Sequence, residues 1–216
     1  MDIIIIIHIS KNMKYSFYPN RNTMFWINKR LFDVVISLFL LPLLIIISIF
    51  LLSLNPFYNI GKLIFIQERM GKNCEAFFAY KFRTMSPIDE ITRRYDDPIE
   101  IDRITPLGRI LRRSRIDELP QILNVLRGDM SLIGPRPDYY AHALEYLKNV
   151  EGYYDRHNIR PGITGLSQVT LGYVESLDLI SKKVSIDNYY IKNVSYTSEL
   201  KIIFNTILVI IRCIGK

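Results

Sequence analysis

Two adjacent carboxylates, Asp117 and Glu118, lie in a segment that is rich in arginine. A carboxylate can act as a nucleophile or as a ligand for a divalent metal, and cations neutralise phosphoryl oxygens, so this mixture suits chemistry on a phosphate. A simpler explanation is that acidic residues favour the start of a helix, here one with Pro120 in its first turn. The nearby cations, which favour the phosphate interpretation, are Arg112, Arg113, Arg115 and Arg136.

Cations elsewhere in the chain are less specific signals. Lys81 and Arg83 are two residues apart in a strand-like run, so both can face one side of a strand, although a solvated strand edge explains them equally well. Arg136 stands between Pro135 and Pro137, on a stiff backbone that suits bidentate recognition of a phosphate. None of these signals is decisive by itself.

A long apolar segment precedes these residues. From Leu31 to Leu54 the chain is almost wholly Leu, Ile, Val and Phe, long enough to span a membrane by the criterion of about 20 residues. Pro42 removes a backbone N–H near the middle and predicts a kink. Basic residues on both flanks favour a re-entrant helix-break-helix that enters and leaves by the cytoplasmic face, with Lys29 and Arg30 at the lipid headgroups. A plain transmembrane span is the alternative, because the positive-inside rule is a bias.

Size and charge limit the remaining possibilities. The chain has 216 residues, enough for one soluble domain plus a membrane element. Its net charge of +7 favours polyanionic partners, which include nucleic acid, anionic lipid and nucleotide substrates. Cys74 and Cys213 lie far apart and have neither metal-binding nor redox spacing.

The periodicity after the apolar segment predicts a short hairpin followed by helices. The expected hairpin strands are Lys62–Arg69 and Glu75–Phe82, and the expected helices are Pro106–Arg113, Leu119–Arg127, Leu144–Glu151, Ile180–Tyr190 and Leu200–Ile214. Residues 86–103 are predicted to form a mobile surface loop, and Arg160–Gly165 a turn. The apolar run Ile3–Ile9 has no signal-peptide pattern and is interpreted as a short strand or an extra membrane contact.

Five motifs occur together in an order and spacing that resemble a known family. They are Lys29-Arg30-Leu31-Phe32-Asp33, Lys81-Phe82-Arg83-Thr84-Met85, Asp117-Glu118-Leu119-Pro120-Gln121, Gly128-Asp129-Met130-Ser131 with Gly134-Pro135-Arg136-Pro137, and Arg160-Pro161-Gly162-Ile163-Thr164-Gly165. From Asn28 onwards the chain resembles the bacterial sugar transferases that prime glycan assembly, the small monotopic phosphoglycosyl transferases. We therefore expect an α+β protein. Residues 1–28 would form an N-terminal extension, and residues 29–55 a re-entrant membrane helix-break-helix. Residues 56–216 would form a small, mainly helical cytoplasmic catalytic domain with a short β-hairpin and membrane-associated helices.

The resemblance also implies an activity. It is a Mg²⁺-dependent transfer of a sugar 1-phosphate from a UDP-sugar to polyprenyl (undecaprenyl) phosphate. The resemblance places this reaction at the cytoplasmic face of the bacterial inner membrane. It would be the first membrane step in the biosynthesis of a polysaccharide or glycoconjugate, such as capsule or O-antigen. Asp117 would attack the β-phosphorus, expel UMP and hold Mg²⁺, and Glu118 would complete the catalytic dyad. The implied phosphate- or nucleotide-binding residues are Lys81, Arg83, Arg112, Arg136 and Gln168, and the implied membrane anchor is Lys29, Arg30, Asp33 and Pro42.

Two departures from the family pattern limit the prediction. Leu41 stands where a small residue usually precedes the kink proline, so the exact geometry of the break is not predicted. Thr170–Tyr173 stand where members often continue Gly-Arg-Asn, so the donor sugar is not predicted either. The expected partners are a UDP-sugar, polyprenyl phosphate and an anionic phospholipid membrane, with no nucleic acid; a homodimer is compatible with the sequence. The alternatives are a basic, membrane-anchored binding protein without catalysis and a glycosyltransferase that releases UDP.

Overall fold

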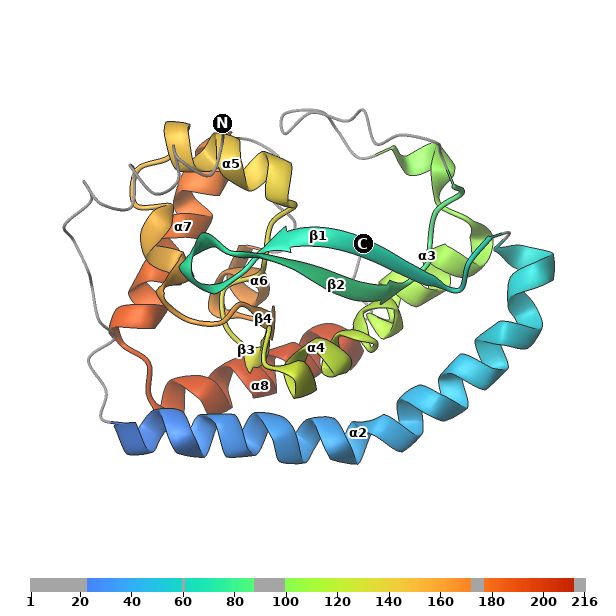
Figure 1. Ribbon diagram of the computed structural model, residues 1–216, viewed down its shortest axis with the longest axis horizontal. Coiled ribbons are helices and arrows are strands. Elements are labelled where there is room, and N and C mark those ends of the chain that lie inside the picture. The colour runs from blue at the N-terminus through green and yellow to red at the C-terminus, as the bar shows by residue number, and fades with distance from the viewer. Residues whose placement is uncertain (1–22, 60, 88–99, 172–176, 212–216) are drawn as a thin grey trace.

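The computed structural model describes residues 23–59, 61–87, 100–171 and 177–211, and its architecture is mostly helical with two small sheets (Figure 1). The helices are α2 (Thr23–Tyr58), α3 (Pro106–Arg113), α4 (Gln121–Arg127), α5 (Tyr140–Asn149), α6 (Leu166–Leu171), α7 (Leu177–Lys192) and α8 (Tyr196–Ile211). The strands are β1 (Ile64–Met70), β2 (Ala76–Phe82), β3 (Ser131–Ile133) and β4 (Gly162–Thr164). Short 3-10 turns cover Lys72–Cys74, Ile101–Arg103, Ile116–Glu118 and Tyr154–Asn158.

The apolar segment forms α2, one helix of 36 residues that is long and apolar enough to cross a membrane. Pro42 and Pro56 both lie inside it. The helix runs along one side of the molecule and changes direction about halfway (Figure 1). Such a bend is expected where a proline removes a hydrogen-bond donor from the helical ladder. The predicted kink is therefore present, but the helix continues through it without a break and extends beyond both ends of the predicted segment 29–55.

One face of α2 packs against the rest of the protein along both halves of the helix. Its buried residues follow helical spacing, and they are Phe25, Lys29, Asp33, Ser37, Leu44, Leu51 and Asn55. In the second half, Leu44 and Leu51 share an apolar cluster with Phe82 of β2 and Ile122 of α4. The other faces expose large apolar side chains, among them Phe39, Ile46, Ile49 and Phe50. Exposed surface of this kind marks a membrane or protein contact.

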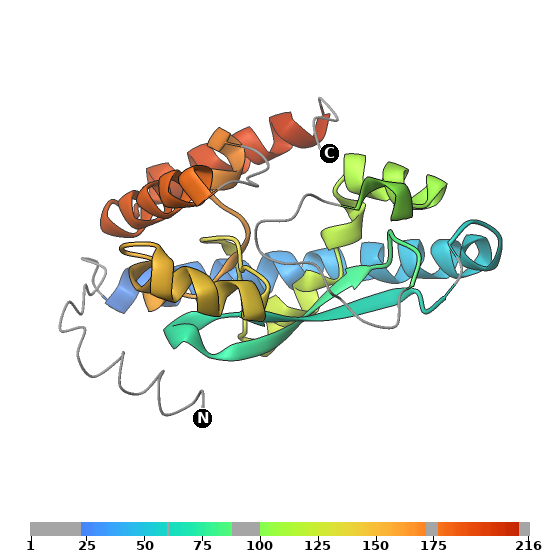
Figure 2. The same cartoon turned by 90° about the horizontal axis from the view of Figure 1, so that it is seen from above.

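The predicted hairpin is confirmed. Strands β1 and β2 pair antiparallel, from Ile64 opposite Phe82 to Met70 opposite Ala76. Viewed from above, the hairpin and the helices α7 and α8 lie on opposite sides of the molecule, with α5 between them (Figure 2). An apolar cluster joins these elements, since Met70 of β1 and Val184 of α7 both pack with Tyr146 of α5.

The prediction of a simple turn over Arg160–Gly165 was wrong, because residues 162–164 form strand β4. This strand pairs parallel with β3, with Gly162 opposite Ser131 and Thr164 opposite Ile133. A Cβ atom at Gly162 would lie 2.1 Å from the backbone nitrogen of Gly134 and would prevent this approach of the two chains. Strands of three residues are too short to show the alternation by which a strand is recognised in a sequence.

Among the predicted helices, α3 has the predicted bounds and α4 ends before Gly128 as expected. Helices α5, α7 and α8 begin before their predicted starts, and α6 was not predicted. Residues 3–9, most of the predicted loop 86–103, Cys213 and the end of the predicted last helix lie outside the described residues.

Candidate functional site

Asp117 and Glu118 lie in the 3-10 turn Ile116–Glu118, which joins α3 to α4. The turn is preceded by Arg115, whose φ of 60° places it in the left-handed region. Such a backbone is uncommon for a residue with a side chain, and its strain is often found at functional sites. Because α3 ends at Arg113 and α4 begins at Gln121, the two carboxylates lie in the short connection between these helices. Both carboxylates are buried, with 8% and 6% of their surface exposed.

Glu118 binds cations from three different segments. It accepts two hydrogen bonds from the Arg136 guanidinium, one of them 3.1 Å long, and a third of 3.1 Å from the Lys81 ammonium. Arg115 lies 3.9 Å away. Although burial alone would raise it, the pKa of Glu118 is held well below its usual range by Arg136 and Lys81. Glu118 is therefore an ionised carboxylate that fixes two cations beside Asp117.

Asp117 differs from Glu118 in its hydrogen bonding and in the direction of its pKa shift. Its Oδ1 atom is buried and has no hydrogen-bond partner among the described residues. Burial, and after it the neighbouring charge of Glu118, raises the pKa of Asp117 to about 6, against the opposing effect of Lys81, Arg136 and Arg112. A buried carboxylate with a free oxygen and a raised pKa is typical of a reactive group. The sequence predicted the two acids, but it did not predict that Glu118 is paired with cations while Asp117 keeps an oxygen available.

Lys81 is the cation that β2 contributes to the site. The pKa of Lys81 is lowered to about 8, mainly by burial and also by the guanidinium groups of Arg136 and Arg69, while Glu118 acts in the opposite direction. The pKa of Lys81 is thus close to neutral pH, because this lysine is buried and lies beside other cations.

The loop that carries Arg136 is fixed by hydrogen bonds to three successive backbone carbonyl groups. Arg156 donates to the carbonyl of Arg136 (2.7 Å), and Arg69 donates to the carbonyl of Pro137 (3.0 Å). The backbone N–H of Met70 donates to the carbonyl of Asp138 (3.0 Å). Arg156 is itself 1% exposed and pairs with Asp138 and with Asp187 of α7. The stiff backbone predicted around Arg136 therefore has a buried ionic support.

The other predicted phosphate-binding residues differ in how near they lie to this cluster. Arg112 donates to Thr84 (2.9 Å) and lowers the pKa of Asp117, although burial and the charges of three other residues have larger effects. Arg83 lies beyond the end of β2, donates to the Lys62 carbonyl (2.8 Å) and stacks over the Phe65 ring.

The strand ends at Phe82 as predicted and Arg83 follows it directly, so the shared strand face of Lys81 and Arg83 stays a prediction. Gln168 donates to the Ile163 carbonyl (3.0 Å), and its Oε1 atom is buried without a partner among the described residues. An oxygen acceptor fits a ligand hydroxyl or N–H better than a phosphate oxygen.

The predicted headgroup contacts of Lys29 and Arg30 are corrected by the structure. Lys29 is 8% exposed and forms a 2.5 Å ion pair with Glu199 of α8. Arg30 donates to the carbonyl groups of Val125 and Leu126 (2.7 and 3.2 Å) at the end of α4. Asp33 accepts from the hydroxyl of Ser131 (2.7 Å) and the N–H of Leu132 (3.1 Å). These residues attach α2 to the rest of the protein, Lys29 through an ion pair and Arg30 and Asp33 through hydrogen bonds.

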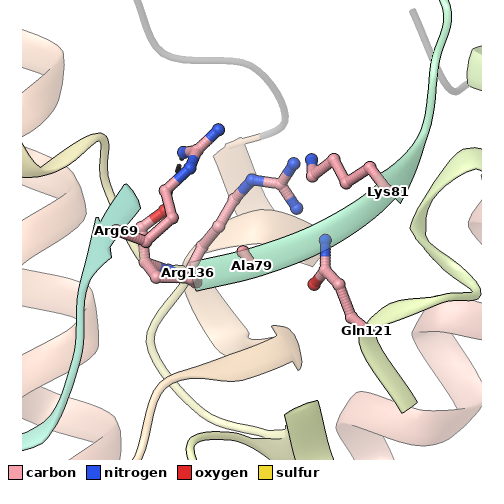
Figure 3. Close-up of a pocket in the computed structure, with 6 residues that line it drawn as sticks. Arg69, Ala79, Lys81, Gln121 and Arg136 are labelled. Carbon is pink, nitrogen blue, oxygen red and sulfur yellow. Dashed lines mark hydrogen bonds between the residues drawn. The ribbon is translucent and has the colours of Figure 1, made fainter. Parts of the chain in front are cut away.

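A pocket opens beside the cluster, between the hairpin and α4. It is lined by Arg69, Ala79, Lys81, Gln121, Arg136 and Pro137 (Figure 3). Arg69 and Gln121 were not among the predicted site residues. Gln121 belongs to the motif that was used for the resemblance, but no spacing rule indicates that its side chain faces a pocket.

Mg²⁺ is the metal that the resemblance implies. Among the described residues no three of His, Cys, Asp and Glu gather into a metal site. Mg²⁺ is commonly bound through one or two carboxylates together with substrate phosphates and water. The unpartnered Oδ1 of Asp117 fits such a ligand, whereas the oxygens of Glu118 are occupied by Arg136 and Lys81.

With this arrangement established, comparison with known proteins identifies the class. The family model of the bacterial sugar transferases matches residues 24–213, so the chain belongs to this family. It is 36% identical over 208 residues to the UDP-N-acetylgalactosamine-undecaprenyl-phosphate N-acetylgalactosaminephosphotransferase of Aeromonas hydrophila, covering 96% of this chain and 49% of that protein.

Two other relatives differ in length. The UDP-glucose:undecaprenyl-phosphate glucose-1-phosphate transferase of Escherichia coli is 36% identical over 189 residues, which cover 83% of this chain and 39% of that protein. The exopolysaccharide production protein PSS of Rhizobium leguminosarum is 38% identical over 187 residues, 83% of this chain and 93% of that protein. The chain thus spans half or less of the length of the Aeromonas and Escherichia relatives.

Proposed function

We propose that this protein transfers a sugar 1-phosphate from a UDP-sugar to polyprenyl phosphate, with undecaprenyl phosphate as the lipid named for its relatives. In the first step an oxygen of Asp117 attacks the β-phosphorus of the donor. The bond from this phosphorus to the bridging oxygen breaks, and UMP leaves with the electron pair. In the second step a phosphate oxygen of the lipid attacks the same phosphorus, which releases the Asp117 carboxylate and gives a polyprenyl diphosphate sugar.

The observation that carries this proposal is the contrast between the two adjacent acids. Asp117 keeps a buried oxygen without a hydrogen-bond partner in the described part of the chain, and Glu118 is neutralised by Arg136 and Lys81. A nucleophile must be ionised and unobstructed, which describes Asp117 above pH 6. Cations held in place beforehand stabilise the charge that develops on the phosphoryl oxygens, and such stabilisation is most of what phosphoryl transfer requires.

Other residues support the same reaction. Lys81, Arg136 and Arg112 surround the carboxylates from three elements and offset the charge of a diphosphate. Asp117 would hold Mg²⁺ together with oxygens of the donor, and the ion would supply further charge neutralisation there. Arg156 and Asp138 keep the Arg136 loop in place.

We further propose that α2 is re-entrant and that the protein lies at the cytoplasmic face of the inner membrane. The support for this is that both halves of α2 pack against the same domain, through Lys29 and Asp33 in the first half and Leu44 and Leu51 in the second. A straight span could not keep both halves on one domain, because the far half would lie across the bilayer.

The released nucleotide tests the reaction. Membranes that contain the protein are incubated with Mg²⁺, polyprenyl phosphate and a panel of UDP-sugars, beside the variants Asp117→Asn and, as a control, Asp102→Asn at an exposed acid. We expect UMP from one preferred donor, lost in Asp117→Asn and kept in Asp102→Asn. Release of UDP would indicate ordinary glycosyl transfer, and release of neither nucleotide would favour a non-catalytic protein. The panel is needed because the relatives are named for different sugars.

A further inference from the structure

Gln121 is a buried amide that faces the pocket beside the two carboxylates. It is 3% exposed and lines the pocket together with Lys81 and Arg136. Within the described part of the chain its side chain takes part in no hydrogen bond. A ligand that occupies the pocket can supply the hydrogen bond that the rest of the protein does not give this amide.

The neighbours of this amide indicate what such a ligand must be. Its nitrogen is directed toward the same space as the Arg136 guanidinium and the Lys81 ammonium (Figure 3). Each of these groups donates hydrogen bonds, and arginine and lysine cannot accept any. A group with several acceptor oxygens and a negative charge satisfies all three donors, and a phosphoryl group has these properties.

Asn124, on the same helix, shows what a structural amide looks like in this protein. Its side chain donates to the Phe78 carbonyl (2.7 Å) and accepts from the Tyr80 N–H (3.1 Å), and so joins α4 to the hairpin. It is fully buried, and its donor and acceptor are both used. Gln121 is similarly buried but has no comparable bond, so packing of the protein alone does not explain it.

We propose that Gln121 contacts the substrate and donates a hydrogen bond to a non-bridging oxygen of the phosphoryl group that Asp117 attacks. Gln121 follows Asp117 by four residues, and its pocket shares Lys81 and Arg136 with the carboxylates. A further cation at this place would attract the carboxylate of Asp117. A neutral hydrogen-bond donor stabilises the phosphoryl charge without attracting that carboxylate. This inference rests on the proposed function and assigns a contact within it.

Replacement of Gln121 by methionine, which has nearly the same shape but no donor, tests the contact. We expect kcat/KM for UMP release to fall about 10- to 100-fold, the effect of a hydrogen bond to a charged group, while the thermal midpoint stays the same or rises. The control Asn124→Leu should lower the midpoint, because it leaves the Phe78 carbonyl and the Tyr80 N–H unpaired. Activity of Gln121→Met within threefold of wild type, or a fall in its midpoint like that of the control, would overturn the proposal.

A second variant identifies which end of the amide is used. Gln121→Glu keeps an acceptor but replaces the donor by a negative charge, so its activity should lie below that of Gln121→Met. Activity above Gln121→Met would mean that the amide accepts from a sugar hydroxyl, and would contradict the phosphoryl contact.

Binding of UDP with Mg²⁺ separates this inference from the proposed function. Titration calorimetry should show about tenfold weaker binding of UDP to Gln121→Met than to wild type. If wild type releases no UMP from any donor, the proposed reaction fails, while weaker UDP binding by Gln121→Met still supports the phosphoryl contact. Equal UDP binding by both proteins refutes the contact whether or not UMP is released.

Discussion

The guanidinium of Arg136 binds both oxygens of the Glu118 carboxylate, although the two residues are 18 positions apart and belong to different elements. The same carboxylate also holds Lys81 of β2. Glu118 therefore joins the hairpin, the turn before α4 and the loop after β3 at one point. The acid next to it in the sequence, Asp117, has an oxygen atom beside these cations that no other described residue contacts by a hydrogen bond.

Loss of the Glu118 charge should disorganise the cations. In Glu118→Gln we expect UMP release to fall at least 100-fold and the thermal midpoint to fall, because Arg136 and Lys81 would then repel each other without an anion between them. The control is Glu145→Gln, whose ion pair with Lys148 is exposed and contributes little to stability. A Glu118→Gln enzyme with normal activity would show that Glu118 does not organise the site.

Replacement of Asp117 by asparagine should stop turnover and also stabilise the protein. A pKa raised from 3.8 to about 6 means that the ionised carboxylate costs the folded state about 3 kcal/mol above pH 6. The cost decreases as pH falls through 6 and is absent below about 4, where the carboxyl group is protonated in both the folded and the unfolded state. The unfolding free energy of Asp117→Asn should thus exceed that of wild type at pH 8, by up to about 3 kcal/mol.

The measurement is chemical or thermal unfolding of both proteins at pH 8, 6 and 4. The difference between them should shrink over this series. A variant that is less stable than wild type at pH 8 would indicate that the Asp117 charge stabilises the fold, and would argue against a strained, reactive carboxylate.

The sequence predicted the parts of the fold that repeat a pattern. The hairpin, α3 and α4 follow from alternation, from Pro106 and Pro120 near helix starts and from Gly128 at a helix end, where φ is 99°. The strands β3 and β4 could not be predicted in this way, because each has three residues and depends on a close approach of Gly134 and Gly162 that only the folded chain creates.

Prediction of the site was limited for a different reason. Residue types and motifs identified the two acids and four of the cations around them, but local spacing does not show which side chains are already paired. Lys29 is the clearest example. Beside an apolar helix its charge suggested a lipid headgroup, whereas Glu199, 170 positions away, neutralises it inside the protein. Long-range pairing of this kind leaves no local signal in a single sequence.

The Lys29–Glu199 pair should therefore affect folding more than membrane binding. Among the described residues, Lys29→Met leaves the buried Glu199 charge with only the hydroxyl of Tyr190, and we expect a loss of about 3–5 kcal/mol in stability. The double variant Lys29→Met/Glu199→Met should regain part of this loss. The control is Lys201→Met, at an exposed lysine of α8, which should have little effect.

Thermal unfolding and vesicle flotation of the Lys29 variants measure the two effects separately. If Lys29 instead binds headgroups, Lys29→Met will float poorly with anionic vesicles and unfold at the wild-type temperature.

The re-entrant path of α2 predicts that its two ends lie on the same side of the membrane. Cysteines placed at Thr23 and Phe57, both exposed, should be labelled by an impermeant maleimide only from the cytoplasmic side. Cys213 is replaced beforehand, and the buried Cys74, whose pKa burial raises to about 12, reacts poorly. Labelling of the two positions from opposite sides would establish a transmembrane span.

The most direct test of the account is the mass of the protein after incubation with Mg²⁺ and its preferred UDP-sugar in the absence of lipid acceptor. Intact-mass spectrometry should show an addition equal to one sugar phosphate, located at Asp117, which disappears when polyprenyl phosphate is added. Asp117→Asn should show no addition. An unmodified wild-type protein that nevertheless releases UMP when the acceptor is present, or an adduct that persists in Asp117→Asn, would contradict the role of Asp117 as the nucleophile.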